Sequence, residues 1–398
     1  MDLQQAKAQA AAEVERRRPE LVELSRRIHA NPELGFEEKQ AAAALTEFLE
    51  ANGFGVQRGF CELATAFKAS YGRGRPAIAF LAEYDALPKL GHACGHNIIA
   101  CSAVGAALAT KSAMSGVGGS ILVIGTPAEE LYGGKAIMVN RGGFDGISAA
   151  LLVHPFVRDM AAVEALACRG LEVEFFGRAA HAAARPEEGI NALEALILSF
   201  NGINSLRQHI RSDARIHGII THGGDAANVV PDHAAGSFLV RAADEVYLNE
   251  LGRKVLSCFQ AAAMATGAKL QHKWAEVSYA PFRINNALAE LYTANMGALG
   301  RKLRSPRLGV MLGSVDMGNV SMVVPSLHAM VAIAPKDILL HTPEFAEAAI
   351  SPAGHQGLVD GAKALAMTAL DLLMNPEALA KVEEEFLSYS VAGARVHG

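Results

Sequence analysis

The sequence AIAFLAEYDALPKLGHACGHNIIACSAVGAALAT, at residues 77–110, decides the fold. It opens with the apolar run 77–81, which predicts a short buried β-strand, and three polar residues follow at 83–85. Cys94 and His96 come next, at the head of a small-residue, apolar stretch that predicts a packed helix. The stretch therefore predicts a strand that delivers acidic side chains at its carboxyl end, close to a thiol and an imidazole.

Two further apolar runs end in chemically active residues. The run SILVIG at 120–125 precedes TPAEE, which contains Glu129 and Glu130, and the run 149–153 precedes His154. Strands that alternate with helices predict an α/β layer with a mostly parallel sheet. Because ligands bind beyond the carboxyl ends of parallel strands, we expect these side chains to converge on one edge of the sheet.

The pattern changes after about residue 164, where strands with a half-exposed alternation appear. We expect an α/β, zinc-peptidase-like catalytic domain of residues 1–164 and 277–398, interrupted by an inserted α+β lid and dimerisation domain of residues 165–276. The expected helices are 4–29, 38–51, 94–110, 191–207, 248–265 and a final one at 357–373. The later expected strands are 171–176, 216–220, 235–240 and 269–277, followed by apolar runs at 308–312 and 329–333.

Composition narrows the class of protein. The chain has 398 residues, with 36 basic and 41 acidic ones, so its net charge of -5 argues against a nucleic-acid-binding surface. The uncharged stretch 97–110 is shorter than the roughly 20 residues that span a membrane, and the N-terminus lacks the apolar core of a secretory signal. Five scattered cysteines fit a reducing compartment, so we expect a cytoplasmic protein with neither nucleic-acid nor membrane partners.

Each site feature has a plain structural alternative when it is taken alone. Cys94 and His96 suit zinc and related ions, yet a buried cysteine beside a capping histidine gives the same pattern. Glu129 and Glu130 suit a metal ligand beside a general base, although a solvated acidic pair at a helix start is the better interpretation of these two residues alone. A single histidine such as His154 is more often a core residue than a ligand. The convergence of all three strand ends favours a metal site.

The motifs also occur in a fixed order along the chain. They are EYDALP at 83–88, GHACGHN at 91–97, TPAEE at 126–130, His154-Pro155, GRAAHA at 177–182, Gly223-Gly224 with NVVPD at 228–232, DMGNVS at 316–321 and LHTP at 340–343. This set resembles the family of metal-dependent aminoacylases, glutamate-releasing carboxypeptidases and auxin-conjugate amidohydrolases. Glu83-Tyr84 and Asn97 resemble most closely the branch of p-aminobenzoyl-glutamate hydrolase and β-alanyl-lysine dipeptidase.

The resemblance implies a ligand set and a mechanism. Two divalent metal ions (zinc, manganese or cobalt) would be held by Cys94, His96, Glu130, His154 and His341, with Cys94 between them. Glu129 would be the general base on the metal-activated water. Asp85 would accept a hydrogen bond from a ligand histidine and fix its tautomer. His181 would stabilise the oxyanion by reaching across from the lid of a second copy of the chain.

Other roles stay open at this stage. Asn228, Arg241 and His355 are candidates for substrate binding, although Arg241 also fits an ordinary salt bridge. His355 is the alternative to His341 as the last metal ligand. Asn97, which replaces an aspartate common in the family, leaves open a site that holds one metal ion rather than two.

The resemblance implies a homodimeric metallo-amidohydrolase or metallopeptidase. Its substrate would be a small linear amide: an N-acyl amino acid, an aminobenzoyl-amino acid or a dipeptide. Hydrolytic deamination of an aromatic amine on the same metal site is the alternative within enzymes. A catalytically silent metal-binding or assembly protein is the alternative outside them.

Overall fold

The structure is a computed structural model that describes residues 1–303 and 313–395, with side chains up to residue 389. The predicted apolar run at 308–312 therefore lies outside the described residues. The chain divides into two compact units, each of which is described by itself. Apart from the undescribed residues, the first comprises Met1–Glu164, Phe282–Leu312 and Asn319–Gly398, and the second comprises Ala165–Pro281 and Gly313–Gly318.

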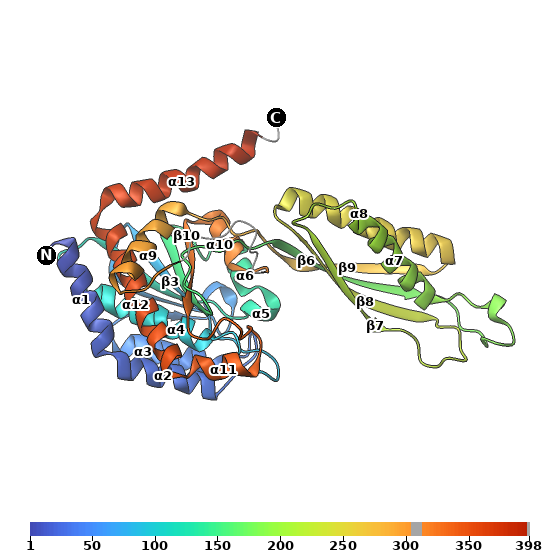
Figure 1. The fold of residues 1–398 in the computed structure, drawn as a ribbon, viewed down its shortest axis with the longest axis horizontal. Helices are drawn as coiled ribbons and strands as arrows, with labels where there is room; N and C mark the ends of the chain where they lie inside the picture. The colour runs from blue at the N-terminus through green and yellow to red at the C-terminus, as the bar shows by residue number, and fades with distance from the viewer. Residues whose placement is uncertain (304–312, 396–398) are drawn as a thin grey trace. The chain divides into compact units, whose positions relative to one another are not determined.

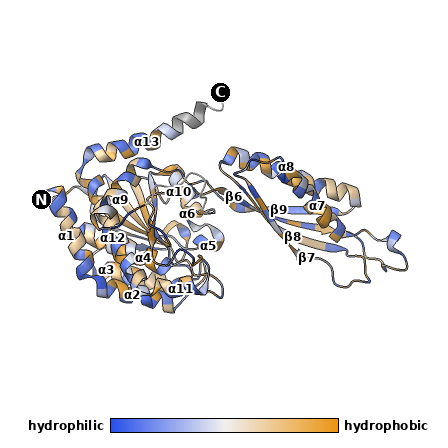
Figure 2. Ribbon diagram, viewed as in Figure 1, coloured by the Kyte–Doolittle hydropathy of each residue, from blue (hydrophilic) through white to orange (hydrophobic). Residues whose placement is uncertain are grey.

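A six-stranded sheet forms the centre of the first unit, in the order β1-β2-β4-β3-β5-β10 (Figure 1). The four strands from β4 to β10 are parallel, and β1 and β2 add an antiparallel edge. The strands are β1 (Gly55–Arg58), β2 (Phe67–Arg73), β3 (Ala77–Ala82), β4 (Gly119–Gly125), β5 (Ala149–Phe156) and β10 (Ser326–Ala332). The expected α/β fold with a mostly parallel sheet is confirmed, and Figure 2 shows predominantly hydrophobic colouring on the central strands.

Helices α4 (His96–Ala113) and α12 (Pro352–Met374) pack on β3 and β5 and against each other. Small residues allow this close approach: a Cβ on Gly105 would lie 2.9 Å from Leu21 and 3.2 Å from Ala362. The other helices of this part are α1 (Leu3–Arg16), α2 (Arg18–Ala30), α3 (Lys39–Ala51), α5 (Glu129–Tyr132), α6 (Gly134–Asn140), α9 (Asn286–Ala298), α10 (Met317–Val323), α11 (Pro343–Ala349) and α13 (Pro376–Arg395), with a 3-10 turn at Phe60–Glu62.

Two of the expected helices were wrong in extent. The single helix at 4–29 is two helices, because α1 ends at the cap residue Arg17 and Pro19 starts α2. Proline lacks a backbone N–H and clashes with the preceding turn, so it is tolerated only in the first turn of a helix. The helix expected to be final at 357–373 is α12, and α13 follows it after a break at Asn375 and Pro376.

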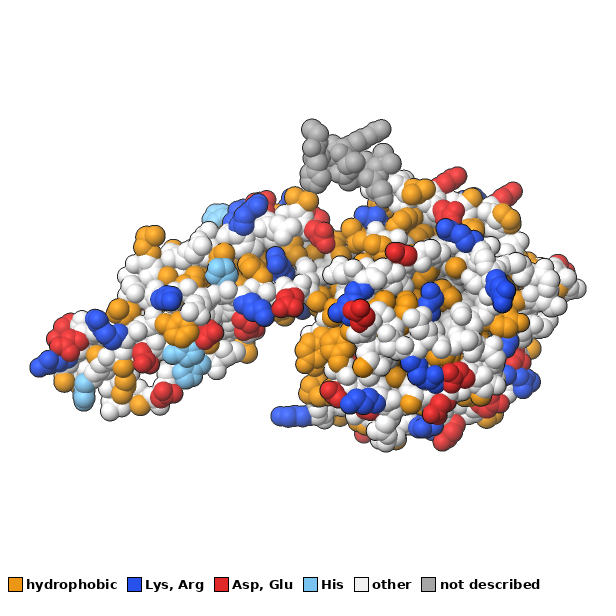
Figure 3. All heavy atoms as spheres, turned by 180° about the vertical axis from the view of Figure 1, so that it is seen from behind, with side chains coloured by type: hydrophobic (Ala, Val, Ile, Leu, Met, Phe, Trp, Pro, Cys, Tyr) orange, Lys and Arg blue, Asp and Glu red, His pale blue; other side chains and the backbone are white. Residues whose placement is uncertain are grey.

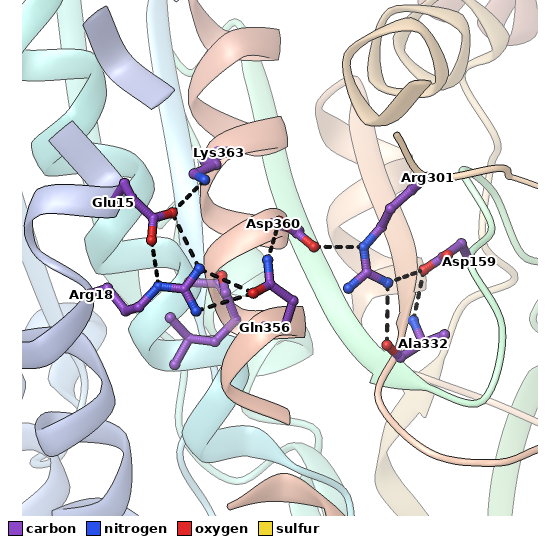
Figure 4. Close-up of polar contacts among 10 residues, drawn as sticks. Glu15, Arg18, Asp159, Arg301, Ala332, Gln356, Asp360 and Lys363 are labelled. Carbon is purple, nitrogen blue, oxygen red and sulfur yellow. Dashed lines mark hydrogen bonds and ion pairs between the residues drawn. The ribbon is translucent and has the colours of Figure 1, made fainter. Parts of the chain in front are cut away.

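Polar side chains tie α1, α2 and the segment after α9 to α12 (Figure 4). Arg18 donates to Glu15 at 2.6 Å and to Gln356 at 3.0 Å, and Gln356 donates to Asp360 at 2.8 Å. Arg301 then bridges Asp360 and Asp159, at 2.8 and 2.9 Å. The chain of contacts fixes how the helical layer sits over the strands.

The second unit is a four-stranded antiparallel sheet, in the order β7-β8-β6-β9, covered by two helices (Figure 1). Its core is a separate cluster of buried aliphatic and aromatic residues from the sheet and both helices. The elements are β6 (Ala167–Phe176), α7 (Ala192–Arg207), β7 (Arg215–His222), β8 (His233–Ala242), α8 (Glu245–Thr266) and β9 (Lys269–Tyr279), with a 3-10 turn at Pro186–Glu188.

Basic and acidic side chains are intermixed on the face shown in Figure 3. Within residues 1–303 and 313–395, no helix is both long and apolar enough to cross a membrane.

Candidate metal centre

The three strand ends meet as expected. Strands β4, β3 and β5 are adjacent and parallel, so the residues after each strand lie at one sheet edge. Three groups of side chains there have ligand atoms that lie within 4.8 Å of one another. The groups are Cys94, His96 and His154; Cys94, Glu130 and His341; and His96, Glu129 and Glu130. Cys94 belongs to two of these groups, as do His96 and Glu130.

His96 is oriented by Asp85. Its Nδ1 lies 3.0 Å from Oδ1 and 2.9 Å from the backbone oxygen of Asp85, so Nδ1 carries the proton and donates it. Nε2 is therefore the ring nitrogen that faces the cluster. Oδ2 of Asp85 accepts from the backbone N–H of Glu130 at 3.0 Å, which couples two of the strand ends. Although burial lowers the pKa of His96, the Asp85 carboxylate raises it well above the ordinary value.

His154 lies within β5, near its end, and presents Nε2 in the same way. Its Nδ1 lies 2.7 Å from the backbone oxygen of Pro155, so Nδ1 donates there and Nε2 faces Sγ of Cys94 at 3.3 Å. Cys94 precedes α4, and Gly95 turns the chain with φ of 76°. A Cβ on Gly95 would lie 2.5 Å from the ring of Pro155, so only glycine allows this loop to approach β5.

Glu130 and His341 complete the second group. Nε2 of His341 lies 3.5 Å from Oε1 of Glu130, and the backbone N–H of His341 donates to Ala93 at 3.0 Å. Contact with the Glu130 carboxylate raises the pKa of His341. Burial alone would raise the pKa of Glu130, but His341 and His96 outweigh this effect and lower the pKa to about 2. His341 therefore lies in the cluster, whereas His355 belongs to none of the three groups.

A buried glutamate that sequence reasoning missed supports the turn after β4. Oε1 of Glu38 accepts from the backbone N–H of Ala128 at 2.8 Å, and Oε2 accepts from the hydroxyl of Thr65 at 2.8 Å. Ala128 has φ of 61°, a left-handed conformation that non-glycine residues adopt rarely, and it starts α5 with Glu129 as the first residue. Burial raises the pKa of Glu38 to about 6. Only its position as the first residue of an expected helix marked it in the sequence.

A second missed feature is the buried pair of Glu83 and Lys135. Nζ of Lys135, on α6, lies 2.6 Å from Oε1 of Glu83, directly after β3. Oε2 of Glu83 lies 3.5 Å from Nε2 of His96. His328 of β10 lies nearby, with its ring 5.9 Å from the ring of His154, and burial lowers its pKa to about 3. No local sequence pattern marks these partners, because they come from distant segments.

Two predicted residues of the first unit lie outside these groups. His355 is in the first turn of α12, where burial and the nearby Arg26 and Arg18 lower its pKa. Asn97 points away from the cluster, since its amide donates to the hydroxyl of Ser25 on α2 at 2.9 Å.

The second unit carries the remaining candidates at opposite ends of its sheet. Nδ1 of the exposed His181 accepts from the backbone N–H groups of Ala183 and Ala184, at 3.3 and 3.2 Å, which leaves Nε2 protonated as a donor. The backbone oxygen of Asn228 accepts from Ala182 beside it. Both lie just beyond the end of the sheet where Phe176 of β6 pairs with His233 of β8.

Arg241 lies at the other end of β8. It is opposite Cys168, near the start of β6, and its guanidinium donates to Ser314 at 3.1 Å. This contact is to a hydroxyl rather than to a carboxylate.

The cluster has the chemistry of a cation site. Among the described residues, Nε2 of His96 and Oε1 of Glu130 are buried and have no hydrogen-bond partner. Buried polar atoms are nearly always paired, so two unpaired electron-donating atoms that face a thiol and two further histidines fit a divalent cation.

Comparison with known proteins agrees with this interpretation. Residues 168–266, within the second unit, match the peptidase dimerisation domain family. The chain is 39% identical over 402 residues to the Xaa-Arg dipeptidase of Mus musculus, covering 97% of this chain and 93% of that protein. It is 36% identical over 299 residues to one of the two p-aminobenzoyl-glutamate hydrolase subunits of Escherichia coli, covering 69% of this chain and 62% of that protein.

The fold agrees as well. A solved dinuclear metal binding peptidase from the M20 family of Bacillus subtilis superposes with a TM-score of 0.69 at 19% identity, over 90% of this chain and 99% of that one. This chain belongs to the M20 peptidase family. As a member of that family it is a metal-dependent hydrolase of amide bonds, which confirms the expected fold and reaction class.

Proposed function

We propose that the chain holds two divalent metal ions and hydrolyses dipeptides with a cationic C-terminal residue. The five ligands would be Cys94, His96, Glu130, His154 and His341, with Cys94 shared. The observation that carries this assignment is that the two ligand groups around Cys94 have their donor atoms within 4.8 Å of one another. Irving–Williams preferences leave zinc, manganese and cobalt open for this thiol, imidazole and carboxylate set.

When bound, such ions polarise a scissile carbonyl and lower the pKa of a water molecule toward about 7. Glu129, the first residue of α5, takes the proton of the attacking water and returns it to the nitrogen of the leaving amine. Glu130 and Asp85 hold the edges of the site rigid through their shared hydrogen bond. The neighbouring carboxylates at 129 and 130 thus divide into a base and a ligand.

His181 would stabilise the oxyanion, and it would do so in a second copy of the chain. Its Nδ1 already accepts two backbone hydrogen bonds, so Nε2–H is available to a developing negative charge. About eight residues of β6 separate the sheet end next to His181 from the end next to Arg241, a span of about 26 Å at about 3.3 Å per residue. His181 and Arg241 of one chain therefore cannot contact the same small substrate, and both serve one site only if two copies contribute.

The proposed homodimer would use the edge of the second sheet. Strand β7 is an edge strand, and its Ile219 and Ile220 are 65% and 43% exposed. Ile197 and Leu198 of α7 are also exposed. Such an apolar edge favours pairing with another copy.

Five free cysteines support a reducing, cytoplasmic location.

The substrate class comes from the two relatives. The dipeptidase similarity spans nearly the whole chain, so a dipeptide ending in arginine or lysine is the first candidate. Similarity to the p-aminobenzoyl-glutamate hydrolase favours p-aminobenzoyl-glutamate as the second.

A hydrolysis panel tests the proposal. The panel holds Xaa-Arg and Xaa-Lys dipeptides, β-alanyl dipeptides, p-aminobenzoyl-glutamate and N-acyl amino acids, each assayed before and after chelation. Chelation-sensitive release of arginine or lysine supports the proposal. Turnover of p-aminobenzoyl-glutamate alone selects the second candidate, and no turnover with metal restored contradicts both.

A further inference from the structure

A buried lysine–glutamate pair lies beside the metal-ligand cluster, and the proposed reaction gives it no role. The side chains of Glu83 and Lys135 are 3% and 0% exposed, and their charged atoms are 2.6 Å apart. Glu83 stands between β3 and Asp85, and Lys135 comes from α6, so the pair joins two elements that frame the site.

Stability alone does not account for this pair. Removing two charges from water is expensive, and apolar residues of similar volume are often equally or more stabilising in such positions. The chain offers a comparison in Lys7 and Asp371, also 2.6 Å apart, which join α1 to α12. That pair is slightly more exposed and has no metal-ligand neighbour among the described contacts.

The free oxygen of Glu83 points to a role in the site. Oε2 is buried, has no hydrogen-bond partner in the described part of the chain, and lies 3.5 Å from Nε2 of His96. Because Nδ1 of His96 donates to Asp85, Nε2 is the ring nitrogen that faces this oxygen. A divalent cation bound to Nε2 would therefore lie beside a carboxylate oxygen that attracts it.

We propose that Glu83 is a positioning residue of the metal centre, held in place by Lys135. The carboxylate places a fixed negative charge beside the metal-binding nitrogen of His96 and so favours occupation by a divalent cation. Lys135 binds the other oxygen and keeps the carboxylate in this orientation. Glu83 is not a member of any group with ligand atoms within 4.8 Å, so it acts through His96 and through its charge. This inference rests on the proposed metal-ligand set.

The two members of the pair should change metal affinity by different amounts. Glu83→Gln removes the charge that favours the cation, and we expect binding about 10- to 100-fold weaker, the range for residues that support metal ligands. Lys135→Met keeps the charge of the carboxylate and frees only its orientation, so we expect a smaller loss than in Glu83→Gln. Competition with a chromophoric chelator, using Zn²⁺ and metal-stripped protein, measures both. Equal losses in the two variants, or an unchanged affinity in Glu83→Gln, overturn the proposal.

Two further variants separate this role from a structural one. The double variant Glu83→Gln with Lys135→Met removes both charges of the 2.6 Å pair, and it should bind Zn²⁺ about as weakly as Glu83→Gln. Lys7→Met is the matched control, and we expect a lower melting temperature with unchanged Zn²⁺ affinity. A double variant with the affinity of the unaltered chain, or a control that weakens binding as much as Glu83→Gln, overturns the proposal.

The unaltered chain is measured first. If it binds no Zn²⁺, the proposed function and this inference both fail. If it binds Zn²⁺ and Glu83→Gln binds equally well, only the inference fails.

Discussion

Asp85→Asn tests whether Asp85 orients the proposed metal ligands His96 and Glu130. Asp85 accepts from Nδ1 of His96 through one oxygen and from the backbone N–H of Glu130 through the other, both at 3.0 Å. An amide keeps only one oxygen, so its NH2 group must face one of these two donors. A buried donor without a partner costs about 1–3 kcal/mol. The substitution also removes the negative charge that strengthens both hydrogen bonds.

The expected loss in metal affinity follows from that geometry. Partners that orient a ligand histidine typically contribute about 10- to 100-fold to metal affinity, which corresponds to about 1.4–2.7 kcal/mol. Chelator competition measures the affinity, and urea unfolding of metal-stripped protein measures the stability. We expect both to fall in Asp85→Asn.

A second aspartate-to-asparagine substitution, outside the metal centre, controls for the effect of exchanging a carboxylate for an amide. Asp244 caps α8 in the second unit by accepting from the backbone N–H of Tyr247 at 2.7 Å. Asparagine caps helices as well as aspartate does, so Asp244→Asn should leave metal affinity unchanged. Asp85→Asn protein with the metal affinity of the unaltered chain would refute the proposed role of Asp85.

Three further predictions follow from the same cluster. Glu129→Gln should abolish hydrolysis and leave metal content unchanged, as elemental analysis and the substrate panel would show; retained activity excludes Glu129 as the base. Contact with the Glu130 carboxylate raises the pKa of His341 above 6.5, so metal affinity should rise with pH through that raised pKa. Chelator titrations from about pH 6 to 9 measure this dependence, and His341→Gln should flatten the plot of metal affinity against pH. In metal-stripped protein the interaction of protonated His341 with Glu130 stabilises the folded state below pH 6.5, and this stabilisation is lost as the pH rises through the raised pKa of His341. Gly95→Ala should lower both melting temperature and metal affinity, because its Cβ would lie 2.5 Å from a proline ring of β5, whereas Gly116→Ala, with φ of 78° and open space around it, should lower only the melting temperature.

The sequence predicted the part of the fold that holds the site. Fully apolar runs mark the buried parallel strands β3, β4 and β5, and the polar residues after them identify the functional edge of the sheet. The position of Cys94 before α4, rather than within it, depends on the left-handed Gly95, which the apolar pattern does not reveal.

Other features depended on tertiary contacts. Strand β1 at the sheet edge and its neighbour β2 lack an apolar run, and α13 follows α12 too closely to appear as a separate element. Glu38 and Lys135 act on segments far from them in the sequence, so their roles appear only when α3 and α6 pack beside the strand ends.

The number of divalent ions bound per chain tests the central claim most directly. Elemental analysis of untagged, reconstituted protein should give two ions per chain. Their removal by a chelator should abolish amide hydrolysis, and their return should restore it. One ion per chain would contradict the shared-Cys94 ligand set, and no bound ion after reconstitution would contradict a metal-dependent hydrolase altogether.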